Sequence, residues 1–254
     1  MNDSSPTQPS SPTQQIAPPS GFALCPRQGL LLGLLSAAIV FAIVQATYPI
    51  FRMSEKVNVA MGRPTAEFLA VIRQNDRNEQ KHAALYLGCL GALTAGALSL
   101  RESLARRTWL APILALPLGA LGGAVGGWLG CLVLEHARDT IGQLELKHLV
   151  EAQLAAGLPL GLGIGLGFGV ATRSLANFAK SAATGLAAGA VAGTAYAVIV
   201  SILLPTSGTD ALLPVEASTR LLWLCTLAGL IGLIIPVAGK QKTTTTVPLT
   251  GPAT

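Results

Sequence analysis

Two pairs of side chains have the types and the spacing of metal ligands. Glu79 and His82 are three residues apart, and so are His148 and Glu151. On a helix this spacing puts both members of a pair on one face, where they could share a metal ion. Two carboxylates and two imidazoles suit zinc or iron. The alternative is a solvated, charge-balanced rim that binds no metal.

No catalytic motif accompanies these pairs. The sequence contains no nucleotide-binding loop, no HExxH and no GxSxG. The cysteines do not form the close pairs that a zinc or redox motif needs. They are Cys25, Cys89, Cys131 and Cys225. We therefore expect no cofactor, and we expect that the protein is not an enzyme.

The composition indicates a membrane environment. Of the 254 residues 51% are hydrophobic and only 11% are charged, against about 25% charged in soluble domains. A soluble protein of this composition would expose large apolar patches. The calculated pI of about 9.3 does not indicate nucleic acid, because the basic residues are scattered at the ends of apolar runs and form no patch with aromatic residues. The expected partner is a lipid bilayer.

Six uncharged runs are long enough to cross that bilayer. At a rise of 1.5 Å per residue, each spans a hydrocarbon core of about 30 Å as a helix. In lipid the backbone must satisfy its own hydrogen bonds, which favours helices. The predicted fold is all-α, a multi-pass transmembrane helical bundle of six glycine-rich helices over residues 28–239. The predicted spans are 28–48, 83–100, 109–134, 152–172, 181–204 and 221–239.

Polar tails flank the predicted bundle. Residues 1–27 and 240–254 are rich in Ser, Pro, Thr and Gln, a composition that predicts disorder. The first span could instead be a cleaved signal peptide, with Val44, Gln45 and Ala46 resembling a cleavage site. Five spans would then remain. The run is longer than a typical signal segment, which favours six.

The basic residues predict the orientation. With six spans, both tails share one side with the short turns at residues 101–108 and 173–180. These two turns hold five basic residues, and short basic loops stay in the cytoplasm. We predict that both termini are cytoplasmic, in a plasma membrane or a bacterial inner membrane. Outside, residues 65–81 are expected to form a surface helix that runs into the second span, and Thr140 to cap a later helix.

Glycines recur every four residues in three consecutive spans. This spacing puts small residues on one helical face and lets backbones approach closely. The pattern resembles glycine-zipper membrane segments, which implies close helix packing, allows oligomers and implies no particular activity. Some glycines could instead face another copy or line a narrow passage. The predicted packing residues are Gly119, Gly122, Gly123, Gly126, Gly127, Gly130, Gly157, Gly161, Gly165, Gly169, Gly185, Gly189 and Gly193.

A duplicated hairpin is a further prediction. Glu79 and Arg101 are 22 residues apart, as are Glu151 and Arg173, and each interval contains a glycine-rich span followed by Ser-Leu-Ala. An ancestral repeat would give this spacing. Chance similarity in a chain so rich in glycine and leucine is the alternative.

Three functions remain open. The spans contain no Asp, Glu, Lys, Arg or His, which argues against proton relays, ion-coupled carriers and voltage sensors. The first hypothesis is a non-catalytic scaffold or assembly protein. Its partner would be a second copy, in a homo-oligomer, or another membrane protein. The second is a channel or carrier for a small uncharged solute. The third is a membrane enzyme with outward-facing metal ligands.

Overall fold

A computed structural model describes residues 24–47, 50–51, 66–107, 109–141, 145–172, 174–203, 211–214 and 216–239. Within these ranges the secondary structure is six helices and no strand, which confirms the predicted all-α fold. The tails for which disorder was predicted lie outside the described residues, apart from residues 24–27. Of these, Pro26 and Arg27 already belong to the first helix.

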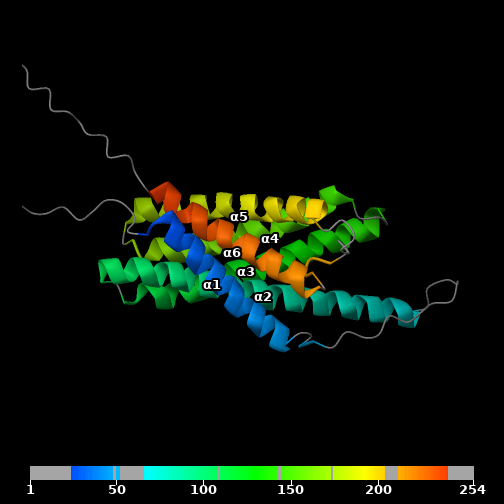
Figure 1. Ribbon diagram of the computed structural model, residues 1–254. Helices are drawn as coiled ribbons and strands as arrows, with labels where there is room; N and C mark the ends of the chain where they lie inside the picture. The colour runs from blue at the N-terminus through cyan, green and yellow to red at the C-terminus, as the bar shows by residue number, and fades with distance from the viewer. Residues whose placement is uncertain are drawn as a thin grey trace, which may run out of the picture.

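Each of the six helices contains a stretch long and apolar enough to cross a membrane, as predicted. Successive helices run in alternating directions, with α1 and α6 inclined to the other four, so α1 begins and α6 ends at the same end of the bundle (Figure 1). The helices are α1 (Pro26–Thr47), α2 (Ala66–Arg106), α3 (Ala111–Ile141), α4 (Leu146–Val170), α5 (Leu175–Leu203) and α6 (Ala217–Gly239).

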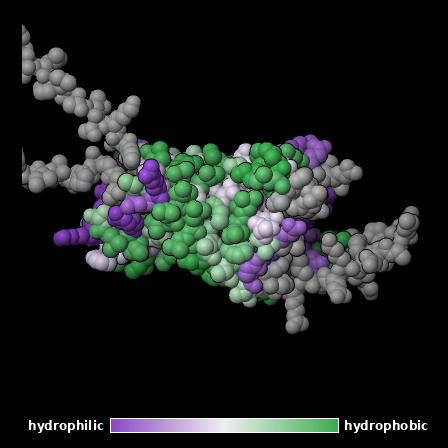
Figure 2. All heavy atoms as spheres, in the orientation of Figure 1, coloured by the Kyte–Doolittle hydropathy of each residue, from purple (hydrophilic) through white to green (hydrophobic). Residues whose placement is uncertain are grey.

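The surface of the bundle is an apolar belt between two polar ends (Figure 2). Large apolar side chains stand exposed on several helices, such as Leu31 at 65%, Leu121 at 63% and Ile202 at 71%. Water would penalise this surface, whereas lipid tails solvate it. The chain is therefore a multi-pass membrane protein.

Two helices extend beyond the apolar belt on the side opposite the chain ends. In α2 the uncharged stretch begins at Ala83, and the 41-residue helix starts well before it, at Ala66. This confirms the predicted surface helix that runs into the second span, and Figure 1 shows it projecting from the bundle. On the facing helix, α3 continues past its uncharged run to Ile141.

The predicted helix start at Thr140 is wrong, because Thr140 lies inside α3. The residue that precedes α4 is Glu145, which forms a capping box with His148. The outer part of α3 has a helical neighbour, since Arg138 reaches Asp76 of α2. This contact with the outer part of α2 stabilises the turns of α3 that extend beyond the membrane surface.

Neighbours in sequence are mostly neighbours in space. Helices α2, α3, α4 and α5 each pack against the next, whereas α1 packs mainly against α6. Helices α2 and α4 also contact each other, and each contacts α6. Large side chains such as Trp223, Tyr86 and Phe168 are fully buried where these helices meet.

Candidate functional site

The two glycine rows of α3 face two different helices. A Cβ added at Gly119, Gly123 or Gly127 would come within 3.0 Å of α2 backbone atoms, those of Gly91, Leu87 and Ala83 respectively. A Cβ added at Gly122, Gly126 or Gly130 would come equally close to α4 carbonyl oxygens, those of Pro159, Ala156 and Ala152 respectively. Such approaches are closer than a real Cβ tolerates, so α3 contacts backbone on both sides.

Helices α4 and α5 meet in the same way. A Cβ at Gly161 would overlap the Gly185 carbonyl, and one at Gly185 would overlap the Gly161 carbonyl. The other predicted glycines of this pair also face across it, with Gly157 opposite Gly189, Gly165 opposite Ser181, Gly169 opposite Phe178 and Gly193 opposite Gln153. All thirteen predicted glycines thus face a neighbouring helix of the same chain.

The glycines between α1 and α6 were not among the predicted packing residues. A Cβ at Gly29 would overlap the carbonyl of Gly232, and one at Gly33 would overlap that of Ala228. The signal in α1 was one pair of glycines four residues apart, which is shorter than the rows in the central spans.

The helical hairpins α2–α3 and α4–α5 do not use corresponding glycines. If the segments that begin at Glu79 and Glu151 were equivalent, Gly91 would correspond to Gly163. Gly91 faces Gly119 of the following helix, whereas Gly163 faces Gly122 of the preceding one. The duplicated hairpin therefore stays a prediction.

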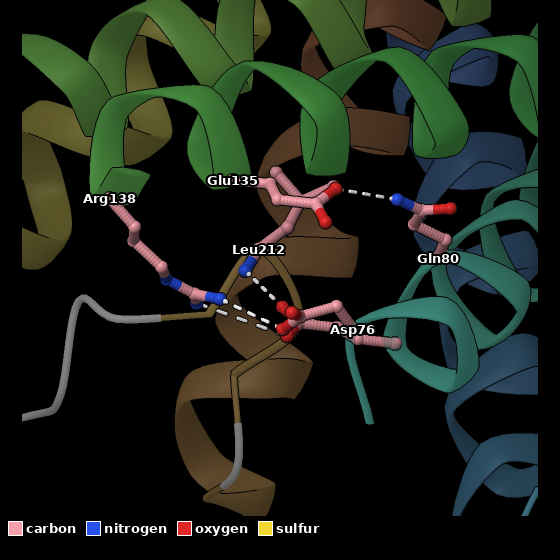
Figure 3. A network of polar contacts seen from close by, with 6 residues as sticks. Asp76, Gln80, Glu135, Arg138 and Leu212 are labelled. Atoms are coloured by element: carbon pink, nitrogen blue, oxygen red, sulfur yellow. Dashed lines mark hydrogen bonds and ion pairs between the residues drawn. The ribbon is translucent and has the colours of Figure 1, made fainter. Parts of the chain in front are cut away.

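A polar cluster lies where the outer parts of α2 and α3 meet (Figure 3). Arg138 of α3 places Nη1 3.6 Å from Oδ1 of Asp76 and Nη2 3.9 Å from Oε2 of Glu79. Beside them, Nε2 of Gln80 donates to Oε2 of Glu135 at 2.8 Å. The hollow between these side chains has a volume of about 10 Å³. That is room for about one water molecule and too little for a metabolite.

The cluster continues into the segment before α6. The Leu212 N–H donates to Oε1 of Glu79 at 3.1 Å, and the Leu212 carbonyl accepts from Nε2 of Gln153 at 3.4 Å. Nε1 of Trp223 in turn donates to Oε1 of Gln153 at 2.9 Å. Leu212 and Trp223 are fully buried. The Leu212 backbone thus joins α2 to α4, and the Gln153 side chain joins α4 to α6. Nothing in the sequence alone indicated this chain of bonds.

Burial sets the electrostatics of the cluster. It raises the pKa of the Glu79 carboxyl above its ordinary value of 4.5, against the opposing effects of Arg138 and the Leu212 N–H. Burial also raises the pKa of the Asp76 carboxyl, again against Arg138. The ionised forms are therefore stabilised less by their partners than they are penalised by the loss of water.

The two histidines of the predicted metal site bind backbone groups. Nε2 of His82 accepts the Phe51 N–H at 3.0 Å, and the imidazole lies against the rings of Phe51 and Tyr86, at centroid distances of 5.0 and 5.8 Å. Nδ1 of His148 accepts the Glu145 N–H at 3.1 Å. One ring nitrogen of each histidine is thus used to hold local structure.

The four metal-ligand candidates belong to separate local contacts. Glu79 is engaged with Arg138 and Leu212, His82 and His148 hold backbone N–H groups, and Glu151 is exposed. Across the described ranges, no three His, Cys, Asp or Glu side chains stand close enough to hold a metal ion. The predicted metal site gains no support from this geometry.

Two features therefore stand out, the glycine contacts between helices and the outer polar cluster. Both link parts of this chain to one another. Comparisons with protein-family models, curated proteins and solved structures find no match for the chain.

Proposed function

We propose that this chain is a non-catalytic membrane scaffold or assembly protein. The observation that carries the proposal is the position of the thirteen glycines, each of which faces a neighbouring helix of the same chain. Where helices lie this close, backbone atoms fill the interface between them. This supports a closed bundle and not one that encloses a passage. The outer polar cluster supports the same conclusion, because its groups bind one another around a hollow of about 10 Å³.

The proposed role of the glycines is to drive this packing as a glycine zipper does. No hydrophobic force draws helices together in lipid, so dispersion contacts and hydrogen bonds must do so. Facing glycines such as Gly161 and Gly185 bring two backbones together and increase the number of these contacts. The expected result is a rigid unit that presents fixed surfaces to a partner.

The proposed setting is a plasma membrane or a bacterial inner membrane with both termini in the cytoplasm. The start of α1 and the end of α6 lie at the same end of the bundle (Figure 1). The turns after α2 and α4 lie at that same end, and their basic residues favour the cytoplasm. The proposed partner is a second copy of the chain or another membrane protein.

A channel or carrier for a small uncharged solute is the second candidate. The observation in its favour is a proline inside each of three helices, Pro117 in α3, Pro159 in α4 and Pro236 in α6. A proline leaves a backbone carbonyl of its helix without its usual partner, and transporters use such carbonyls at binding sites. Membrane helices also tolerate proline where packing alone requires a bend.

Reconstitution decides between the two candidates. The purified full chain is placed in vesicles, its helical content is measured, and swelling is followed with glycerol and with urea. The scaffold proposal expects a folded chain and solute entry no faster than in vesicles without protein. Faster entry that disappears when the chain is unfolded would overturn it in favour of the channel.

A second measurement tests the scaffold directly. Cross-linking in native membranes, followed by mass analysis, is expected to give a homo-oligomer or a complex of defined stoichiometry. A chain that stays monomeric and without a stoichiometric partner under the same conditions would contradict a scaffold role.

A further inference from the structure

The turn between α2 and α3 contains an arginine where the backbone favours glycine. α2 ends at Arg106, and Arg107 follows with φ 55°, in the left-handed region. Glycine enters this region freely, whereas a residue with a Cβ is strained there. Helices often end on a glycine in this conformation. An arginine in its place suggests that its side chain has a use that offsets the strain.

The side chain of Arg107 is exposed. The neighbouring Arg106 differs, because its Nε binds the buried carboxylate of Glu102 at 2.6 Å. In the part of the chain that the structure describes, no carboxylate forms an ion pair with Arg107. Among the described residues, Arg107 is therefore an exposed cation without a carboxylate partner, and it can bind an external anion.

Large exposed apolar side chains lie close to Arg107 in the sequence. Trp109 and Leu110 are each 73% exposed, and Leu104 on the last turns of α2 is 53% exposed. The turn lies at the end of the bundle where the apolar belt gives way to a polar surface (Figure 2). Tryptophan is enriched at this level of a membrane protein, where its ring lies among lipid headgroups. Arginine can extend its charge to the same level.

We propose that Arg107, Trp109 and Leu110 bind a phospholipid with an anionic headgroup. The Arg107 guanidinium pairs with the negatively charged headgroup, since guanidinium groups form strong charge-assisted hydrogen bonds to phosphate. Trp109 and Leu110 lie along the glycerol region and the upper acyl chains of the same lipid. A free phosphate would use only the arginine, and an acidic protein segment would leave two exposed apolar side chains unexplained. The combination fits a lipid.

The test compares the full chain in phosphatidylcholine nanodiscs with and without phosphatidylglycerol. Thermal unfolding and the lipid that stays bound in native mass spectrometry are measured for the parent chain and for Arg107→Gln. One cation near an anionic surface is worth about 1 kcal/mol, which corresponds to about fivefold. Phosphatidylglycerol is expected to raise the melting temperature of the parent, and Arg107→Gln to retain about fivefold less of it. Arg73→Gln, which changes an exposed cation on the opposite side of the membrane, is expected to behave like the parent.

Arg107→Gly separates lipid binding from the shape of the turn. Glycine relieves the backbone at φ 55°, so this variant is expected to be at least as stable as the parent in phosphatidylcholine alone. Phosphatidylglycerol should nevertheless no longer raise the melting temperature of this variant. A purely structural role for Arg107 would not give these two opposite results.

Several outcomes would overturn the proposal. The first is that phosphatidylglycerol raises the melting temperature of Arg107→Gln as much as that of the parent. The second is that Arg73→Gln loses this rise to the same extent as Arg107→Gln. The third is that the parent retains phosphatidylcholine and phosphatidylglycerol equally. Inorganic phosphate that reproduces the shift in phosphatidylcholine would assign the turn to a free anion. Polyglutamate that reproduces it would assign the turn to an acidic protein.

Discussion

One added methyl group at Gly189 tests the proposed packing of α4 against α5. A Cβ at this position would lie 2.8 Å from the carbonyl carbon of Gly157, with the carbonyl oxygen closer still, and 3.1 Å from the Cα of Gly161. All three atoms belong to the backbone, so no side chain can rotate out of the way. In Gly189→Ala the two helices must therefore move apart.

The size of the effect follows from that separation. A gap of about 0.5–1 Å forfeits a quarter to a half of each dispersion contact along the interface, and overpacking typically costs about 1–3 kcal/mol. Alanine is favoured over glycine inside a helix by about 1 kcal/mol, which offsets part of this cost. Gly189→Ala should then lose up to about 2 kcal/mol of stability.

The matched control is Gly229→Ala in α6. There a Cβ would meet only the side-chain ends of Leu34 at 3.3 Å and Leu30 at 3.4 Å. These ends can shift by a few tenths of an ångström, so the preference of the helix for alanine should dominate. The preference is common to both variants and cancels when they are compared, which leaves an expected difference of about 1–3 kcal/mol.

Equilibrium unfolding in mixed micelles, driven by a denaturing detergent and followed by tryptophan fluorescence, measures this difference. Helical content in the native detergent shows whether each variant is folded at the start. If Gly189→Ala unfolds at the same detergent fraction as Gly229→Ala, the glycine contacts between α4 and α5 do not stabilise the bundle, and the reasoning fails.

Three further predictions concern the outer cluster, the histidines and the orientation. Since burial raises the pKa of Glu79 in the folded chain, lowering the pH from neutral toward 4.5 should increase stability through this group. Glu79→Gln keeps an oxygen for the Leu212 N–H and should weaken the rise in stability at low pH, measured by detergent unfolding. Glu79→Ala should cost about 1–3 kcal/mol of stability, because the N–H loses its partner. An unchanged pH dependence in Glu79→Gln would contradict the role of Glu79 in this rise. Because His82 and His148 each accept a backbone N–H, zinc should leave the melting temperature unchanged, and a zinc-dependent rise abolished by a His82→Ala/His148→Ala double variant would revive the metal site. Reporters fused after Lys147 and Lys180 should read outside and cytoplasm respectively, and the reverse readout would invert the proposed orientation.

The spans were predictable because composition alone decides where a chain can cross lipid. Uncharged runs near 20 residues favour helices in lipid, and each of the six helices covers most of one run. The glycine rows were visible for a related reason. A four-residue spacing defines a helical face before any partner is known, and in α3 the row through Gly119 and the row through Gly122 turned out to face different helices.

The outer cluster was not predictable, because its central group is a backbone unit. The N–H and carbonyl of Leu212 bind Glu79 and Gln153, and every residue has such a unit, so the sequence does not mark this one. The pairing arises only when α2, α4 and α6 are in place. The helix start wrongly predicted at Thr140 has a similar origin, since the outer turns of α3 contact α2 and α3 continues through this residue.

The pairing of α1 with α6 has a consequence for biogenesis. During synthesis the first helix enters the membrane long before the last one exists, and α6 is its main partner. Until then Gly29 and Gly33 lack the α6 backbone that they contact in the assembled bundle. The other four helices can form their glycine contacts in order of synthesis. Insertion of α6 is therefore the earliest moment at which α1 can pack against its main partner. A ribosome stalled before α6 should leave α1 open to proteases and to other helices.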